Sequence, residues 1–209
     1  MEKNITLWGS AISNYVRCVA LCCREKGVVY QLQAPDEKLL SLNPFKKIPV
    51  MEHDGNVIYE TAAICRYIDR VFDGPALSPS DPVLLAWMDQ WISAANCYFD
   101  SAIIRRYVLE YTFPKGDKGQ LREDVIATAE TEIKNYLGIM EMGLNEYDCF
   151  SGNKLGIADY LIVPMLDYLS NGVVPTNLVA EFPGVENYLT RMLQRESTQQ
   201  LLGDPRVQP

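Results

Sequence analysis

Residues 42–68 constrain the fold most, because their turn residues predict a short hairpin that leads directly into a helix. Pro49 has no N–H to give to a sheet ladder, so it belongs at the start of a strand or on a sheet edge. Asp54-Gly55 suits the positive φ angles of a two-residue hairpin turn, and residues 57–59 form the return strand. Apolar residues then recur at the spacing of one helix face, at Ile64, Tyr67, Ile68 and Val71.

The same segment offers backbone groups to a ligand. A strand that opens with Pro49 leaves the N–H and C=O groups of Ile48 facing outward, where an extended peptide can pair with them. A proline at this position can also follow a cis peptide bond. The helix that starts near Thr61 has free N–H groups, which favour a carboxylate. The segment therefore suits a small acidic peptide.

Two motifs in this segment resemble the glutathione-binding half of the cytosolic glutathione S-transferases. Asn43-Pro44 and Lys47-Ile48-Pro49 match the family pattern NP-x-G-K/Q-V/I-P, and Glu60-Thr61-x-Ala-Ile matches E-S-x-A-I. Lys46 stands where the family commonly has glycine, and Thr61 replaces the common serine while keeping its hydroxyl. The resemblance implies a serine-type, bacterial-like family member with glutathione as co-substrate.

The first half of the chain reads as a βαβ unit followed by the hairpin and its helix. A strand is predicted at residues 4–8, a helix capped by Ser13 through Lys26, and a second strand at residues 28–32. Residues 34–42 are a connection with one helical turn. This order predicts an α/β thioredoxin-like N-terminal domain, which the resemblance also implies.

A stretch rich in proline, glycine and serine at residues 73–82 predicts the domain boundary. We expect a glutathione-binding domain at residues 1–75 and an all-α helical C-terminal domain at residues 83–209. Helices are predicted at residues 82–112, at 120–144 with one apolar face, at the nearly all-apolar 157–170, and after Phe182-Pro183-Gly184.

The start of the 157–170 helix resembles the capping box of the family's core helix. Asp159 is expected to accept a hydrogen bond from the backbone N–H at the N-cap, Gly156. Glycine costs little at an N-cap relative to serine, so Gly156→Ser is expected to be neutral or slightly stabilising.

Composition excludes several classes of protein. The net charge of −8 argues against nucleic-acid binding, which depends on lysine and arginine. No apolar run approaches the ~20 residues of a membrane span, and the N-terminus lacks the apolar core of a signal peptide. We therefore expect a cytoplasmic protein that binds neither nucleic acid nor membrane.

Cysteine usage gives no metal motif. The six cysteines include no CxxC pair, and His53 is the single histidine, so no metal site is predicted. Cys18, Cys22 and Cys23 fall in an apolar helix, where free thiols behave as small buried hydrophobes.

The resemblance implies that a side chain near the start of the first helix stabilises the thiolate of bound glutathione. Ser13 fits the serine-type spacing Gly9-x-x-x-Ser13, and a hydroxyl can cap a helix and donate to sulfur together. Ser10 is the second candidate. Tyr15 is expected to pack or to line the electrophile pocket.

The resemblance also assigns the ligand contacts. Lys47 would approach the glycyl end or the peptide backbone, and Ile48 would pair with the cysteinyl backbone next to a cis Pro49. Glu60 and Thr61 would hold the γ-glutamyl group. The electrophile pocket would lie between the first helix and residues 99–113, with these candidates: Ile12, Tyr15, Arg105, Arg106, Tyr107 and Phe113.

The predicted activity is the conjugation of glutathione to a small hydrophobic electrophile, a reaction of detoxification, by a homodimeric enzyme. Two alternatives stay open. A thiol-disulfide or dehydroascorbate-type reductase would need a cysteine at the Ser13 position, where the sequence has none. A non-catalytic glutathione-binding protein of the same fold would keep the same binding motifs.

Overall fold

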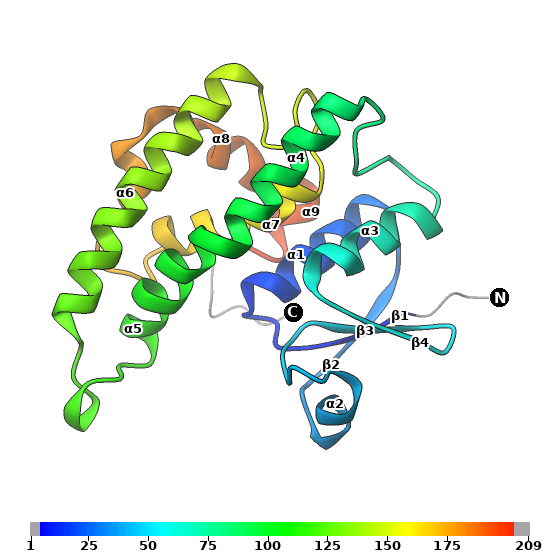
Figure 1. Cartoon of the computed structure of the whole chain (residues 1–209), viewed down its shortest axis with the longest axis horizontal. Coiled ribbons are helices and arrows are strands. Elements are labelled where there is room, and N and C mark those ends of the chain that lie inside the picture. The colour runs from blue at the N-terminus through cyan, green and yellow to red at the C-terminus, as the bar shows by residue number, and fades with distance from the viewer. Residues whose placement is uncertain (1–4, 203–209) are drawn as a thin grey trace.

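The structure is a computed structural model that describes residues 5–202, and it begins with a four-stranded sheet (Figure 1). The strands, in the spatial order β2-β1-β3-β4, are β2 (Tyr30–Gln33), β1 (Ile5–Trp8), β3 (Val50–His53) and β4 (Asn56–Tyr59). β1 pairs parallel with β2 and antiparallel with β3, and β3 pairs antiparallel with β4. The thioredoxin-like topology predicted from the sequence is confirmed.

Helices cover both faces of this sheet. α1 (Asn14–Glu25) and α3 (Thr61–Val71) lie on one face, and α2 (Glu37–Leu42) lies on the other (Figure 1). Leu39 of α2 packs with Trp8 and Val50 in a small apolar cluster. The opposite face joins the main core of the molecule.

The hairpin turn has the conformation that its sequence predicts, with φ of 48° at Asp54 and 77° at Gly55. The second strand starts two residues later than predicted. The N–H of Val28 donates to the Cys23 carbonyl at 2.8 Å after Gly27 has reversed the chain at φ 66°. Val28, expected as the first residue of the strand, thus instead completes the hydrogen bonding at the end of α1.

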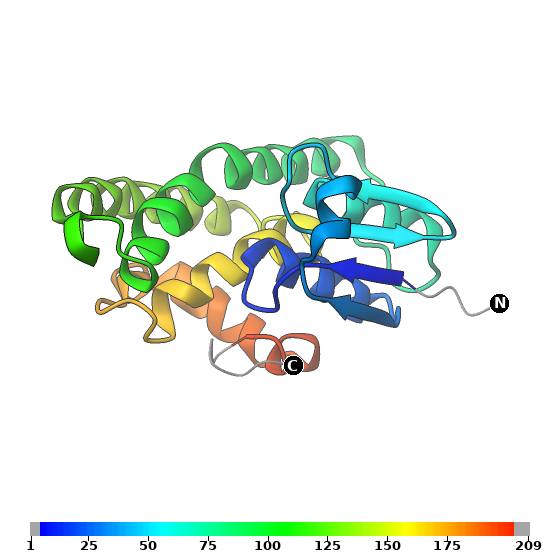
Figure 2. The ribbon, with the colours of Figure 1, turned by 90° about the horizontal axis from the view of Figure 1, so that it is seen from below.

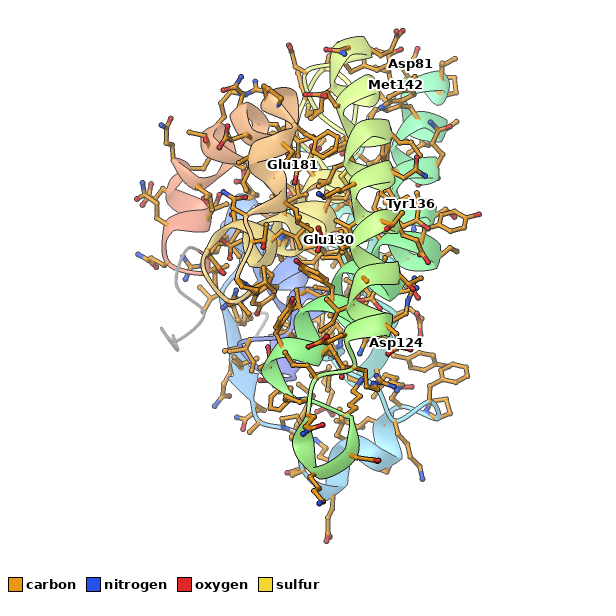
Figure 3. All side chains as sticks on the ribbon, turned by 90° about the vertical axis from the view of Figure 1, so that its left-hand side faces the viewer. Asp81, Asp124, Glu130, Tyr136, Met142 and Glu181 are labelled. Carbon is orange, nitrogen blue, oxygen red and sulfur yellow. The ribbon has the colours of Figure 1, made fainter. Side chains whose placement is uncertain are left out.

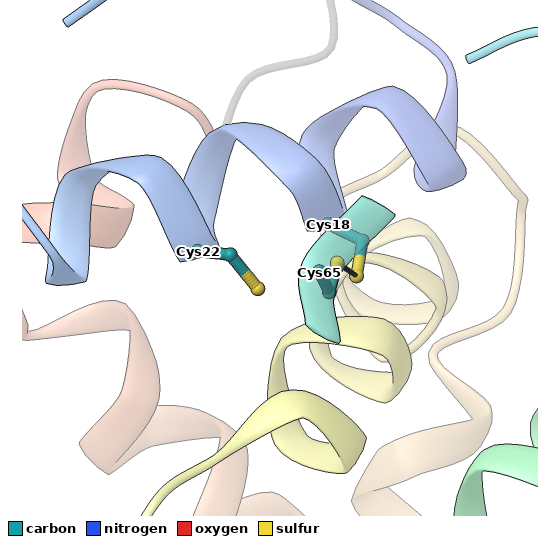
Figure 4. Close-up of side chains that lie close together, drawn as sticks. All are labelled: Cys18, Cys22 and Cys65. Atoms are coloured by element: carbon teal, nitrogen blue, oxygen red, sulfur yellow. Dashed lines mark hydrogen bonds between the residues drawn. The ribbon is translucent and has the colours of Figure 1, made fainter. Parts of the chain in front are cut away.

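Cysteines form the contact between α1 and α3 (Figure 4). The sulfurs of Cys18, Cys22 and Cys65 lie within 4.8 Å of one another, and Cys18 Sγ is 3.7 Å from Cys65 Sγ. All three are buried, as is Cys23, whereas Cys97 is exposed. The prediction that the α1 cysteines are buried free thiols is confirmed, and burial raises the pKa of Cys18 and Cys22.

The second half of the chain is helical, as predicted. Its helices are α4 (Pro82–Ala94), η1 (Ala95–Val108), α5 (Leu109–Thr112), α6 (Glu123–Glu146), α7 (Ile157–Ser170), α8 (Pro183–Leu193) and α9 (Glu196–Gln199), with the short 3₁₀ turns η2 (Asp117–Gly119) and η3 (Leu178–Glu181). Figure 2 shows the sheet at one end of the molecule and these helices extending from it. In the described residues 5–202, no helix is long and apolar enough to cross a membrane.

α4, η1 and α5 follow one another without a break, which confirms the long helix expected at residues 82–112. The turns of η1 are wider than those of an α-helix, and the N–H of Leu109 reaches back to the Ile104 carbonyl at its end. Segments with such wide turns are rare and are frequently found at functional sites.

The amphipathic pattern of α6 is also confirmed. Its inner face buries Ala129, Ile133, Leu137 and Met140. Figure 3 looks onto its outer face, where Lys134 lies 3.4 Å from Glu130 and 2.9 Å from Glu181 of η3.

Asp159 organises the start of α7, which is buried along its length. Its carboxylate accepts hydrogen bonds from the N–H groups of Gly156, Phe150 and Ser151 at 3.0, 2.9 and 3.1 Å, and from the Tyr188 hydroxyl at 2.7 Å. The predicted cap at Asp159 is confirmed. It also fixes the preceding loop.

The expectation that Gly156→Ser is neutral is wrong. A Cβ at this position would lie 2.4 Å from the Leu77 carbonyl oxygen and 2.8 Å from Ser151 Oγ. The Leu77 carbonyl accepts from the Ile157 N–H at 3.0 Å, so the segment between the two halves of the chain rests directly on the start of α7. Position 156 therefore requires glycine, because the Leu77 carbonyl and the Ser151 side chain leave no room for a Cβ.

Candidate functional site

Two cavities lie between the sheet domain and the helices. The polar cavity, of about 320 Å³, is lined by Tyr15, Asn43, Lys47, Ile48, Pro49, Glu60, Thr61, Ala62, Asn96, Asp100 and Arg105. The apolar cavity, of about 490 Å³, is lined by Ser10, Ile12, Ser13, Asn14, Tyr15, Lys47, Ile48, Ile104, Arg105, Val108, Leu109, Thr112, Phe113, Tyr168 and Val173. Tyr15, Lys47, Ile48 and Arg105 line both, so the cavities adjoin.

The residues predicted to bind glutathione meet in the polar cavity. Lys47, Ile48 and Pro49 approach from the segment before β3, and Glu60 and Thr61 from the start of α3. The bond between Ile48 and Pro49 is cis, as expected.

Asn43 fixes the loop that carries these residues. Its buried side chain donates to the Lys47 carbonyl at 2.8 Å and accepts from the Phe45 N–H at 2.9 Å. Lys46, at the position where glycine is common in the family, has a φ of 53°. Left-handed backbone of this kind favours glycine, which accounts for the family preference.

Glu60 holds a strained backbone immediately before α3, with φ 68° and ψ 114°. Such conformations cost about 1–3 kcal/mol for a non-glycine residue and cluster at functional sites. No side chain caps α3 in the described structure. The first N–H groups of this helix, beginning at Thr61, therefore lie open to a ligand carboxylate.

Ser13 caps α1 as predicted, and its Oγ accepts from the Val16 N–H at 3.5 Å. Ser10 and Ser13 both line the apolar cavity, beside the boundary with the polar one. Gly9 permits this arrangement, because a Cβ there would lie 2.3 Å from Val16 Cγ2. Tyr15 lines both cavities, and burial raises its pKa, so its hydroxyl stays protonated.

Four of the residues proposed for the electrophile line the apolar cavity: Ile12, Tyr15, Arg105 and Phe113. Arg106 and Tyr107 do not. Arg106 turns away to Glu132 of α6, with nitrogen–oxygen distances of 2.8 and 2.5 Å. Tyr107 is fully buried against Tyr111.

Arg105 reaches the cavities from the same helix. Its Nε donates to Asp100 at 2.8 Å, and the other oxygen of Asp100 accepts from the Asn14 side chain at 3.3 Å. This chain of contacts ties η1 to the start of α1, beside the boundary between the cavities.

Comparison with known proteins identifies the family. The family model for the glutathione S-transferase N-terminal domain matches residues 7–76, and that for the C-terminal domain matches residues 102–196. A probable glutathione S-transferase of Solanum tuberosum is 31% identical over 169 residues, which cover 74% of this chain and 68% of the relative. The chain belongs to the glutathione S-transferase family. Its membership agrees with the family resemblance found in the sequence motifs.

Two further similarities concern the fold and the share of a longer relative that this chain matches. Glutathione transferase F7 of Populus trichocarpa shares the fold, with a TM-score of 0.84, 22% identity and coverage of 94% of this chain and 97% of the other. Elongation factor 1-gamma 3 of Oryza sativa subsp. japonica is 26% identical over 80% of this chain, and the match spans 39% of that longer relative.

Residues outside the recognised motifs hold the Gly9–Ser13 loop of this family member. Arg17 is buried, donates from Nε to the Ala11 carbonyl at 2.9 Å and lies 5.1 Å from the ring centre of Tyr168. The Tyr168 hydroxyl donates to the Ile12 carbonyl. The only sequence signal for this anchor is an arginine within the apolar stretch at residues 16–23.

The wall of the apolar cavity at Phe113 continues into a loop that Glu110 fixes. The Glu110 carboxylate is fully buried and lies 2.6 Å from Arg122 Nη2. It also accepts from the N–H groups of Lys115 and Arg122, both at 3.2 Å. Hydrogen bonding to Arg122 is the main cause that lowers the pKa of Glu110 from 4.5 to about 2.

This pKa shift predicts a pH dependence of stability. Because the folded-state pKa of Glu110 lies below its unfolded value, its ionised form stabilises the fold above about pH 4.5, and this is lost as pH falls toward 2. We expect Glu110→Gln to lower the urea midpoint at pH 7 and the difference from the parent to shrink between about pH 5 and 2. Glu146→Gln, at an exposed glutamate, is the control. A difference that is constant with pH would contradict this role.

Proposed function

We propose that the protein binds glutathione in the polar cavity and conjugates its thiolate to a small hydrophobic electrophile held in the apolar cavity. The observation that carries this proposal is the shared boundary of the two cavities at Tyr15, Lys47, Ile48 and Arg105. A sulfur bound at that boundary reaches an electrophile on the other side without crossing bulk water.

The charges of the polar cavity suit glutathione. Lys47 and Arg105 supply two cations, and Glu60 and Asp100 supply two anions, which matches a peptide with both a free amine and carboxylates. The proposed contacts follow the motifs. Ile48 pairs with the cysteinyl backbone, Lys47 approaches the glycyl end, and Glu60 and Thr61 hold the γ-glutamyl amine and carboxylate.

The proposed step is attack of the thiolate on the electrophilic carbon. The sulfur lone pair forms the new S–C bond, the leaving group departs with its bonding electrons, and the thiol proton has already passed to solvent. Ser13 donates a hydrogen bond to the sulfur in this proposal, as in a serine-type family member, while its Oγ accepts from Val16. Ser10 and Tyr15 are the other nearby hydroxyls.

Two other functions use the same site. A reductase would need a thiol at the Ser13 position, and the nearest cysteine on α1, Cys18, is fully buried. A glutathione-binding role without turnover gains support from the elongation factor 1-gamma relative, which carries the similar region within a longer protein. We favour the cytoplasmic detoxifying transferase, and turnover of glutathione with a panel of electrophiles separates it from the binding protein.

The proposed contacts of Glu60 and Thr61 with the γ-glutamyl group predict that Glu60→Gln and Thr61→Val each weaken glutathione binding at least tenfold. A lost hydrogen bond to a charged group is worth about 1.5–3 kcal/mol, and about 1.4 kcal/mol corresponds to tenfold in Kd. Calorimetric titration with glutathione measures the effect. Thr131→Val, at an exposed threonine of α6, is the matched control. Unchanged affinity in both site variants would place the ligand elsewhere.

The proposed hydrogen bond from Ser13 to the glutathione thiolate predicts that Ser13→Ala raises the pH at which bound glutathione ionises. A charge-assisted hydrogen bond of ~1.5–3 kcal/mol and a helix N-terminus of ~0.3–1 kcal/mol together account for a shift of about two pKa units, or about 2.7 kcal/mol. Thiolate absorbance followed against pH tests this, and kcat should fall more than KM rises. Ser10→Ala and Tyr15→Phe are measured in parallel. If Ser13→Ala titrates like the parent, the hydroxyl responsible is another one.

A homodimer is part of the proposal, with α3 and the long helix α4–η1 of two subunits facing each other. Arg66 of α3 pairs with Asp89 of α4, so these two helices lie side by side, and the long helix has exposed apolar side chains at Val83 and Tyr98. A stable interface buries well over ~1,000 Å². We expect sedimentation equilibrium to give twice the chain mass and Val83→Glu to lower it. Met142→Glu, at an exposed position of α6, is the control (Figure 3). A parent chain that sediments as a monomer would refute the dimer.

A further inference from the structure

The apolar cavity has a one-sided charge. Of the described residues that line it, Lys47 and Arg105 are the charged ones, and both are cations. The chain as a whole carries a net charge of −8, so two cations without a carboxylate on the same wall depart from its average. A purely neutral hydrophobic ligand brings no negative charge to this side of the cavity.

The position of Arg105 makes it the cation that can serve the apolar cavity. Its Nε is engaged by Asp100, and its side chain is half-exposed. The two Nη groups form the outer edge of the guanidinium fork, which matches the two oxygens of a carboxylate or sulfonate. Both cations line both cavities, but the proposed function gives Lys47 a specific contact, with the glycyl end of glutathione, and gives Arg105 none.

The other residues of the cavity wall can contact the apolar part of such a ligand. Ile12, Ile104, Val108, Leu109 and Phe113 surround the cavity with aliphatic and aromatic surface. Arg105 directly follows Ile104 on η1, so the cation stands at the edge of this surface. An aromatic or branched aliphatic group can occupy the cavity while a terminal anion reaches the guanidinium.

We infer that the electrophile taken by this site is an amphipathic anion, with an apolar body in the apolar cavity and a carboxylate or sulfonate on Arg105. This inference rests on the proposed function for the reaction, but the anion-binding part of the site is testable by itself. Arg105 is then a specificity-determining residue that acts on the electrophile.

Two fluorescent probes that differ by one charged group test the binding step. 8-Anilinonaphthalene-1-sulfonate carries a sulfonate, and N-phenyl-1-naphthylamine has the same ring system without it. We expect Arg105→Ala to weaken binding of the sulfonate about tenfold, equivalent to about 1.4 kcal/mol, and to leave the neutral probe within about twofold. Arg105→Lys should keep part of the preference, and added salt should weaken only the anionic probe.

Arg106→Ala is the matched control, because it removes the same charge from the next residue, which faces Glu132 instead of the cavity. It should leave both probes within about twofold of the parent. Equal weakening of both probes by Arg105→Ala, or no weakening of the sulfonate, would overturn the inference. So would an equal effect of Arg106→Ala, which would indicate a general charge effect.

A kinetic pair separates this inference from the proposed function. 4-Chloro-3,5-dinitrobenzoate and 2-chloro-1,3-dinitrobenzene share one reaction with glutathione, in which chloride leaves as sulfur bonds to the ring, and differ by the carboxylate. With each kcat/KM divided by the uncatalysed rate constant, Arg105→Ala should lower the preference for the benzoate about tenfold. Turnover of both with an unchanged ratio would overturn the inference alone. Charge-dependent probe binding without turnover of any electrophile would overturn the transferase alone.

Discussion

The site depends on the way Arg17 joins the two halves of the chain. This buried side chain holds the Ala11 carbonyl and lies over Tyr168, while its Nη1 is 3.7 Å from Asp167 of α7. The strand-to-helix loop is therefore shaped by a helix more than 150 positions away in the sequence. Both cavities border the first turn of α1, so their form follows from docking of the sheet domain on α7.

The parts of the fold and the site that depend on residues close together in the sequence could be predicted from the sequence alone. Only the β3–β4 hairpin separates the segment before Pro49 from the start of α3, and Pro49 and the Asp54-Gly55 turn are local signals that predict the course of this stretch. The predicted thioredoxin-like order, the hairpin turn and the buried Asp159 cap are confirmed for this reason. Lys47, Ile48, Glu60 and Thr61 could thus be placed together in one cavity.

The sequence could not predict which way a side chain points from a helix, or which residues distant in the sequence come into contact. Arg105 and Arg106 are equivalent by composition, and only the path of η1 decides that one faces the cavities and the other faces Glu132. The need for glycine at position 156 arises from the Leu77 carbonyl, which is remote in the chain. No periodicity within a single helix carries either kind of information.

The distribution of the thiols has a practical consequence for work in solution. Five of the six cysteines are buried, and Cys97 alone is exposed. It follows Asn96, a residue of the polar cavity, and lies on the long helix proposed to face a second subunit. The natural chain therefore provides a single attachment point for a maleimide dye or spin label. We expect a reporter attached there to respond to a ligand in the polar cavity and to the proposed association of subunits, without any engineered substitution.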